Sequence, residues 1–268
     1  MSERPPVRLE AEGPIGWLIL DRPDRMNALS LDAFRAVGEG VRRLDKDPEV
    51  RVIVLRAEGR AFCTGIDLSA LDELLAEPDA AGRERLRREI LELQEDLGAP
   101  ERAAKPVIAA VHGYCLGAGL DLLTACDIRI AEASATFAVR ETKVGLVADV
   151  GTLQRLPAII GEGWFRELAL TGRNFTAEEA LRLGFVTRVC PDREALLAEA
   201  RALAGEIAAN SPLAVQGTKE VSRFSREHGV RAGLEYVAVK NAALLHCEDL
   251  KEALRALQER RTPSFRGT

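Results

Sequence analysis

The sequence predicts an α/β fold that is followed by a helical C-terminal part. Up to about residue 160 of the 268-residue chain, short aliphatic and β-branched runs alternate with amphipathic stretches. After Gly161, nearly every segment has a helical pattern. Hydrophobic residues make up 47% of the chain, which is enough for one large core or for a core with an appendage.

The expected strands and helices follow from these patterns in chain order. Residues 15–20 and 52–55 are expected strands, because Gly, Pro or charged residues bound each aliphatic run. Ser30 is the expected N-cap of a helix over residues 31–44. Residues 106–111 form an apolar run that is typical of a buried strand. Further strands are expected over residues 127–131 and 136–139, and helices over 84–97, 120–125, 164–170, 177–183, 193–208, 212–224, 230–245 and 250–260.

The charge balance and the cysteine count exclude several classes of function. The net charge is 37 − 42 = −5, which argues against nucleic acid or an anionic membrane surface as a partner. No stretch is apolar over the length of a membrane span, and the N-terminus lacks a signal-peptide core. An odd number of cysteines without a C-x-x-C pair predicts buried free thiols, no metal site and a cytoplasmic location. The five are Cys63, Cys115, Cys126, Cys190 and Cys247.

Several common catalytic motifs are absent from the sequence. There is no phosphate-binding loop, no G-x-S-x-G nucleophile elbow and no H-E-x-x-H zinc motif. The two G-x-G sequences, at residues 38–40 and 161–163, lack the third glycine of a dinucleotide-binding turn. Nucleophilic triads, nicotinamide chemistry and zinc hydrolysis therefore lose support.

Two glycine-containing segments each follow a predicted strand. The first covers residues 61–68 with Gly65, and the second covers residues 112–121 with Gly113, Gly117 and Gly119. Exposed backbone N–H groups at such strand-to-helix turns can stabilise negative charge on an oxygen atom. A glycine-rich turn is more often only a turn, so the pair predicts an anion site weakly.

A third segment carries two carboxylates in otherwise small and apolar surroundings. Glu141 and Asp149 stand eight residues apart, and Asp149 lies within Leu-Val-Ala-Asp-Val without a neighbouring cation. An acid in this environment is either exposed on a turn or desolvated with a raised pKa. The residues alone leave both alternatives open.

These segments together resemble the crotonase (enoyl-CoA hydratase/isomerase) superfamily over nearly the whole chain. Residues 21–29 are similar to the family's segment beside CoA, and residues 62–68 to its first oxyanion-hole turn. Residues 105–113 with 117–119 are similar to its second oxyanion-hole turn. The resemblance implies a crotonase-like spiral of ββα units over residues 1–200, which holds the active site. It also implies a C-terminal helical trimerisation region over residues 201–268.

Within the family, the segments around residues 119–129 and 143–157 resemble the Δ3,5-Δ2,4-dienoyl-CoA isomerases. The three acids of that subfamily's pocket fall on Asp121, Glu141 and Asp149. Hydratases of the family typically carry Glu in place of Asp121, and a Pro-Gly-Ala-Gly-Gly-like loop where this chain has residues 148–151. Asp149 is therefore the residue that separates the two activities.

The resemblance implies an isomerase that shifts the double bonds of a 3,5-dienoyl-CoA to a 2,4-dienoyl-CoA. Glu141 would be the base at carbon 2 and Asp149 the acid at carbon 6, with Asp121 tuning Glu141 or merely favouring its own helix start. The implied oxyanion hole is the N–H groups of Ile66 and Ala118; Ala118 replaces a frequent Gly, but only its backbone is needed. The implied substrate and CoA contacts are Arg25, Asn27, Ala28, Thr64, Gly65, Ile66, Asp67, Leu68 and Ala118.

The same resemblance implies an acyl-CoA partner, self-association as a trimer or a dimer of trimers, and no cofactor apart from the CoA of the substrate. Two alternatives remain. One is an enoyl-CoA hydratase or single-double-bond isomerase that uses Asp121 and Glu141. The other is a non-catalytic acyl-CoA-binding or RNA-binding homologue, which the three acids and the net charge of −5 disfavour.

Overall fold

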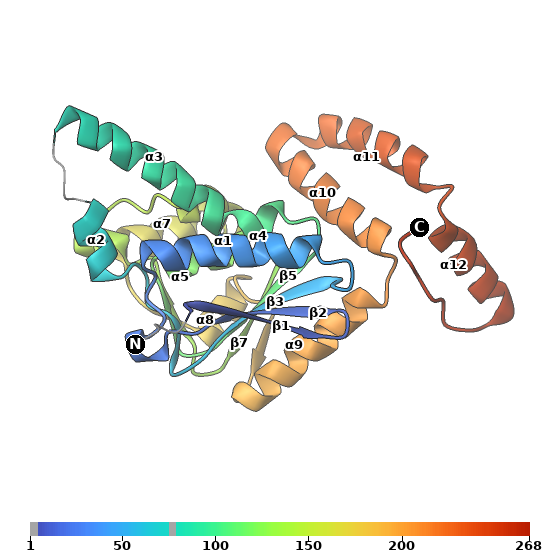
Figure 1. Ribbon diagram of the computed structural model, residues 1–268, viewed down its shortest axis with the longest axis horizontal. Coiled ribbons are helices and arrows are strands. Elements are labelled where there is room, and N and C mark those ends of the chain that lie inside the picture. Colours follow the sequence, from blue (N-terminus) through green and yellow to red (C-terminus); the bar gives the residue numbers. More distant parts are fainter. Residues whose placement is uncertain (1–4, 75–78) are drawn as a thin grey trace.

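Two β-sheets form the centre of the protein, and helices surround them (Figure 1). The computed structural model describes residues 5–74 and 79–268. The large sheet has the order β1-β2-β3-β5-β7-β10 and the small sheet the order β4-β6-β8-β9. The strands are β1 (Val7–Glu12), β2 (Ile15–Leu20), β3 (Val52–Ala57), β4 (Ala61–Cys63), β5 (Val107–Val111), β6 (Tyr114–Leu116), β7 (Ile128–Glu132), β8 (Thr136–Ala138), β9 (Phe175–Thr176) and β10 (Arg188–Cys190).

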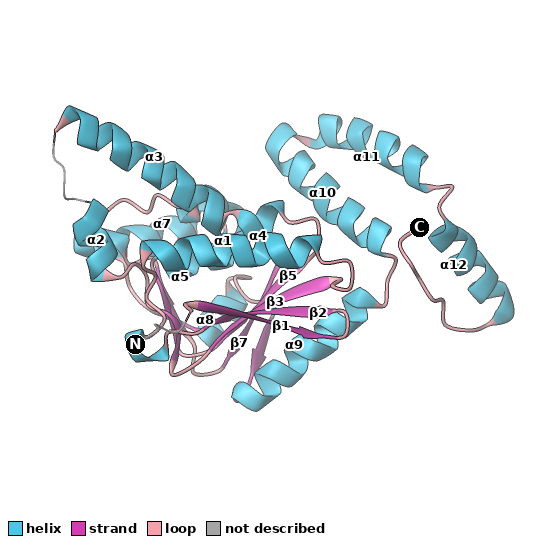
Figure 2. Cartoon of the chain, in the orientation of Figure 1, coloured by secondary structure: helices cyan, strands magenta, loops and turns pink. Residues whose placement is uncertain are grey.

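The chain passes repeatedly from the large sheet to the small one. The strands β3, β5 and β7 pair in parallel in the large sheet. Each is followed directly by β4, β6 or β8, which pair in parallel in the small sheet. Helices complete each turn of the spiral, so the structure confirms the predicted α/β class and its ββα spiral (Figure 2).

Side-chain caps mark the starts of six α-helices in the described part of the chain. The Ser30 hydroxyl accepts a hydrogen bond from the Ala33 N–H, as predicted. Asp79 caps α3 in the same way, so this helix begins at Ala80 rather than at residue 84. The helices are α1 (Leu31–Lys46), α2 (Leu68–Leu74), α3 (Ala80–Leu97), α4 (Ala99–Arg102), α5 (Ala118–Ala125), α6 (Thr152–Ile160), α7 (Glu162–Thr171), α8 (Ala177–Arg182), α9 (Arg193–Ala208), α10 (Pro212–His228), α11 (Val230–Leu244) and α12 (Glu248–Glu259), with 3₁₀ turns η1 (Pro23–Arg25) and η2 (Glu141–Val144).

The part of the chain after Gly161 is nearly all helical, as expected, but two short strands interrupt the helices. The strand β10 pairs in parallel with β7 at an edge of the large sheet, and β9 pairs with β8 in the small sheet. Both strands are too short, at three and two residues, to show an alternating pattern. The edge strand β1 was also missed, because half of its residues are exposed and three of its six are charged.

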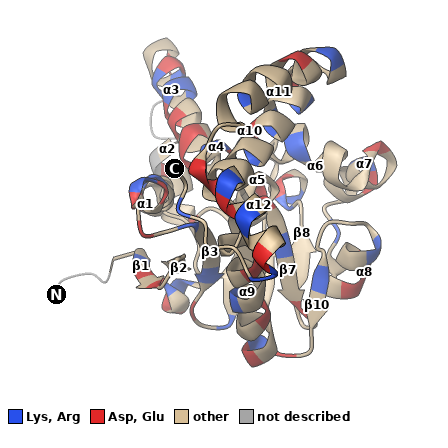
Figure 3. Ribbon diagram, turned by 90° about the vertical axis from the view of Figure 1, so that its right-hand side faces the viewer, with Lys and Arg blue, Asp and Glu red and all other residues tan. Residues whose placement is uncertain are grey.

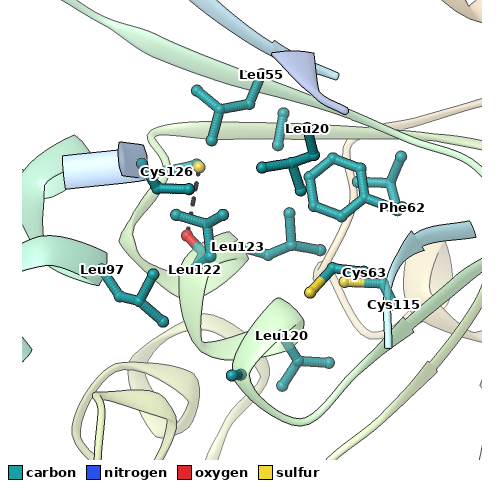
Figure 4. Packing of buried hydrophobic residues seen from close by; sticks show 14 of the residues in the cluster. Leu20, Leu55, Phe62, Cys63, Leu97, Cys115, Leu120, Leu122, Leu123 and Cys126 are labelled. Carbon is teal, nitrogen blue, oxygen red and sulfur yellow. Dashed lines mark hydrogen bonds between the residues drawn. The ribbon is translucent and has the colours of Figure 1, made fainter. Parts of the chain in front are cut away.

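The core lies on both faces of the large sheet. One face packs against α9, with Trp17, Val54 and Ile108 opposite Leu196 and Ala200. The other face packs against α1, α3 and α5 and is continuous with the small sheet. Figure 4 shows the centre of this second layer, where α5 contributes its buried leucines and the Cys126 thiol contacts the Leu122 carbonyl. Aliphatic side chains thus fill a core that contains few aromatic rings.

The last three helices extend away from the sheets (Figure 1). The predicted boundary at residue 200 lies inside α9, which packs on the large sheet, whereas α10 to α12 project beyond it. Large apolar side chains on these helices are exposed, among them Val230, Leu234, Val239 and Leu257. None of the helices in the described ranges has both the length and the apolar character needed to cross a bilayer.

All five cysteines are free thiols. Four of them are buried, as predicted, whereas Cys247 is only half-buried. Cys247 is half-buried at the N-cap of α12, where its sulfur accepts a hydrogen bond from the Leu250 N–H. A thiol in place of the usual hydroxyl or carboxylate hides the capping role from a reading of the sequence.

Candidate active site

A cavity of about 610 Å³ opens between the two glycine-containing turns, the helices α2 and α3, and the segment 140–150. The predicted contact residues that line it are Arg25, Ala28, Thr64, Gly65, Ile66, Asp67, Leu68 and Ala118. The three acids Asp121, Glu141 and Asp149 also line it. Residues that are far apart in the sequence therefore share one pocket.

Asn27 lies outside this pocket, unlike the other predicted contact residues. Its side chain is buried, accepts a hydrogen bond from the Arg22 N–H, and donates to the carbonyl groups of Glu58 and Ala61. This amide stabilises the left-handed backbone at residues 26 and 27, which have φ angles of 50° and 55°. The structure thus gives Asn27 a bracing position behind the pocket wall.

The two glycine turns bring backbone N–H groups together. Gly65 has a φ of +100°, and a Cβ atom there would lie 3.3 Å from the Leu116 carbonyl oxygen and 3.8 Å from the Ala118 nitrogen. Ile66 forms an isolated bridge with Leu29 that uses the Gly65 carbonyl and the Asp67 N–H, and not its own N–H. Ala118 is the first residue of α5, so its N–H has no partner within the helix. This pair of N–H groups can stabilise an anionic oxygen.

Asp121 is held at the base of the pocket. Its side chain is 1% exposed, and its Oδ1 accepts a hydrogen bond of 2.6 Å from the Thr152 N–H at the start of α6. Burial, and then the charge of Glu141, raise the pKa of Asp121 to about 7, although the Thr152 contact opposes this shift. Asp121 therefore lies close enough to sense Glu141 and also anchors α6.

Glu141 begins the 3₁₀ turn η2 and lies against the second glycine turn. A Cβ atom on Gly117, whose φ is +52°, would stand 3.2 Å from the Glu141 Oε1. The other oxygen, Oε2, is buried and has no hydrogen-bond partner among the described residues. Burial is the largest influence that raises the pKa of Glu141, and the charge of Asp149 adds to it. The carboxylate can accept a proton from a group bound beside the Ala118 N–H.

The sequence left open whether Asp149 is exposed on a turn or desolvated with a raised pKa, and the structure shows features of both. It is an exposed residue between the buried Ala148 and Val150, and it faces the pocket. Partial desolvation of the carboxyl group in the pocket raises its pKa above the usual value, although the residue as a whole is exposed. In the described part of the chain, no ion pair involves this acid. Asp149 can therefore hold a proton in a pocket that is otherwise apolar on this side.

The apolar wall of the pocket was not identified from the sequence. It is formed by Leu71 and Leu74 of α2 and by Leu86, Ile90 and Leu93 of α3. The spacing of the α3 residues, i, i+4 and i+7, places them on one face of that helix. Charged residues of both signs surround them along α3 (Figure 3), which masks this face in the sequence. The wall suits an apolar acyl chain.

Other predicted residues have structural contacts. Asp67 lines the pocket, but its Oδ1 accepts a hydrogen bond from the Ser69 N–H and its Oδ2 pairs with Arg22, as expected of a bracing acid. Within the described ranges, no group of three or more His, Cys, Asp or Glu residues is placed to hold a metal ion. The three acids and the N–H groups of the two turns suit acid–base chemistry with backbone stabilisation of an oxyanion.

Replacing Asp121 with Asn tests how the raised pKa of the Asp121 carboxyl group affects the stability of the fold. The pKa of about 7 lies above the usual value of 3.8, so the folded state binds this proton more tightly than the unfolded state. The resulting stabilisation is present below about pH 4 and is lost as the pH rises through 7. We expect the free energy of unfolding of the wild type to fall by a few kcal/mol relative to Asp121→Asn between about pH 4 and pH 8. Urea unfolding at a series of pH values measures this difference, and parallel curves for both proteins would contradict it.

Comparison with known proteins agrees with this geometry. Residues 10–268 match the family model described as enoyl-CoA hydratase/isomerase. The chain is 44% identical over 264 residues to the peroxisomal Δ3,5-Δ2,4-dienoyl-CoA isomerase of Arabidopsis thaliana. The aligned region covers 97% of this chain and 95% of the Arabidopsis protein. It is also 44% identical to the mitochondrial Δ3,5-Δ2,4-dienoyl-CoA isomerase of Homo sapiens, and this alignment covers 90% of this chain and 75% of the human protein. The crystal structure of an enoyl-CoA hydratase from Bacillus anthracis superposes with a TM-score of 0.90 at 31% identity, covering 98% of this chain and 100% of that one.

Proposed function

Because the chain belongs to the enoyl-CoA hydratase/isomerase family, we propose that it isomerises a 3,5-dienoyl-CoA to a 2,4-dienoyl-CoA. The observation that carries this proposal is the third carboxyl group, Asp149, in the same pocket as Asp121 and Glu141. The names of the relatives that are 44% identical to this chain support the same reaction. An acyl-CoA substrate follows from the family itself.

The first step removes a proton from carbon 2. The C2–H bond breaks, the proton moves to the Glu141 carboxylate, and the electron pair spreads over the thioester oxygen and the conjugated carbons. The N–H groups of Ile66 and Ala118 stabilise the charge on that oxygen. The loss of one such donor typically raises the barrier by about 3 kcal/mol. The buried, unpaired Oε2 of Glu141 supports its assignment as the base.

The second step delivers a proton to carbon 6. Carbons 2 and 6 are four bonds apart, roughly 5 Å in an extended chain, so one carboxyl group cannot easily serve both. The Asp149 carboxyl gives its proton to carbon 6, and the double bonds move to positions 2 and 4. Between turnovers, the proton on Glu141 returns to Asp149, so the enzyme is unchanged. The raised pKa of Asp149 favours its protonated form at rest.

Asp121 supports both acids without contacting the reacting carbons in this proposal. It tunes Glu141 through the electrostatic coupling between them, and it anchors the start of α6 through Thr152. Proton transfer of this kind needs no cofactor beyond the CoA of the substrate. Of the residues proposed to meet CoA, Arg25 is exposed at the pocket mouth, which suits a contact with phosphate.

An assay with a 3,5-dienoyl-CoA tests the proposed reaction directly. We expect the absorbance of the conjugated 2,4-dienoyl thioester to appear on addition of the enzyme. A 2-enoyl-CoA serves as the comparison substrate, because the alternative is a hydratase that uses Asp121 and Glu141 alone. Brisk hydration of the enoyl-CoA without any conversion of the dienoyl-CoA would overturn the isomerase proposal.

We also propose that the C-terminal helices carry self-association, as a trimer or as a dimer of trimers. The exposed apolar side chains on α11 and α12 support this, since isolated monomers rarely expose so many on adjacent elements. The division into a core at residues 1–200 and an association region at residues 201–268 belongs to the same proposal. The two dienoyl-CoA isomerases named above are described as peroxisomal and mitochondrial, and the cytoplasmic location expected for this chain stays a prediction.

A further inference from the structure

The segment that carries Asp149 is held by side chains from three different helices. The Gln94 Nε2 of α3 donates a hydrogen bond of 2.6 Å to the Asp149 carbonyl oxygen. The Arg155 Nη1 of α6 donates one of 3.4 Å to the Val150 carbonyl oxygen. Asp121 of α5 accepts from the Thr152 N–H. Residues 149, 150 and 152 are thus each fixed through the backbone, while the Asp149 carboxyl group is left to face the pocket.

The Gln94 contact begins from a rigid part of α3. The preceding Leu93 is 4% exposed and Leu97 is fully buried, so the C-terminal half of this helix is anchored in the core. The N-terminal half is different, because Glu84 there pairs with Arg87 and Arg88 in solvent. The hydrogen bond from Gln94 therefore links the Asp149 backbone to a part of α3 that is packed in the core.

The Arg155 contact depends on a glycine and on a partly buried ion pair. A Cβ atom on Gly151, whose φ is +128°, would fall 1.7 Å from the Arg155 Nη1, so a side chain at residue 151 would displace the guanidinium group from this position. The Nε of Arg155 pairs with Glu101 at 2.8 Å, and both side chains are largely buried. Glu101 in turn pairs with Arg226 of α10. The guanidinium group is thereby fixed across the base of the segment.

We propose that Gln94 and Arg155 are positioning residues that hold the Asp149 carboxyl group at the far end of the diene. This inference rests on the proposed function. Neither side chain is proposed to touch the substrate; each acts through the backbone of the acid or of its neighbour. They control proton delivery at carbon 6 and leave proton removal at carbon 2 to Glu141, which lies on a different element. Loss of either contact therefore slows proton delivery at carbon 6 while proton removal at carbon 2 continues.

The test compares two rates in the same protein, in heavy water with a 3,5-dienoyl-CoA. One is the isomerisation rate, and the other is the exchange of the carbon 2 proton with solvent. The variant Gln94→Met keeps the side-chain length but has no donor. We expect its ratio of isomerisation to exchange to fall about tenfold, since displacements of about 1 Å in a reacting group have effects of this order or larger. Arg155→Lys, which keeps the charge beside Glu101 but loses the planar fork, shifts the ratio in the same direction.

The matched control is Glu92→Gln, a substitution on an exposed position of the same helix. It leaves the ratio unchanged. An equal fall of the isomerisation and exchange rates in Gln94→Met would mean a general loss of structure and would overturn the inference. An unchanged ratio of the two rates in Gln94→Met and Arg155→Lys would also overturn it. A wild type that neither isomerises nor exchanges would instead overturn the proposed function. The two failures are therefore distinguishable.

Discussion

Replacing Asp149 with Asn is expected to abolish isomerisation while the carbon 2 proton still exchanges with solvent. Asn matches Asp in shape but cannot donate an acidic proton to carbon 6. Glu141 lies eight residues away on η2, and the two oxyanion N–H groups lie on the glycine turns, so these groups are expected still to form and stabilise the anion. General acid catalysis contributes about 10²- to 10⁴-fold to a rate, and the isomerisation rate should fall by this amount. Absorbance of the conjugated product and deuterium uptake at carbon 2 measure the two steps.

The matched control for this variant is Asp32→Asn, in which the changed side chain is 89% exposed on α1. It should retain both activities. Isomerisation that persists in Asp149→Asn would show that another group delivers the proton at carbon 6. In that event, the hydratase alternative gains weight, because it makes Asp149 incidental.

Replacing Glu141 with Gln should give a different pattern, in which exchange and isomerisation fall together. The amide fits the same space beside the Gly117 turn but cannot accept the proton from carbon 2. Without that step no anion forms, so the acid at carbon 6 has nothing to protonate. We expect both rates to fall about 10²- to 10⁴-fold. The same two measurements apply, with the thermal midpoint to check folding.

Glu162→Gln supplies the comparison for this second variant, since Glu162 belongs to an exposed ion pair on α7. Exchange that continues at the wild-type rate in Glu141→Gln would remove Glu141 from the role of base. Asp121 is the remaining buried carboxyl in the pocket, and Asp121→Asn would then be the next variant to examine by exchange.

The sequence predicted those elements whose evidence is local. Ser30 caps α1 because its hydroxyl lies three residues before the N–H that it binds, and a pattern of this length is visible in the chain. The two glycine turns and the acids Glu141 and Asp149 were found in the same way, from short segments. Their assembly into one pocket came from the family resemblance, because no local pattern states which turns are neighbours in space.

The features that were missed depend on contacts between distant residues. Gln94 stands 55 residues from the carbonyl group that it binds, and in the sequence it belongs to a strongly charged helical pattern that does not indicate this contact. The strand β10 has only three residues and is defined by its pairing with β7. Asn27 was expected to meet the substrate, yet its amide is used by the backbone of residues 22, 58 and 61. Tertiary packing decides each of these cases.

The close fit of Arg155 against Gly151 limits how this pocket can change during evolution or in design. A side chain at residue 151 would displace the guanidinium group, and a new residue at 155 would leave the partly buried Glu101 with Arg226 as its remaining ion-pair partner. The aspartate alone is therefore a poor unit for transplantation into a hydratase scaffold. The transferable unit is the aspartate together with Gln94, Gly151, Arg155 and Glu101, which would have to be exchanged as a group and inherited as one.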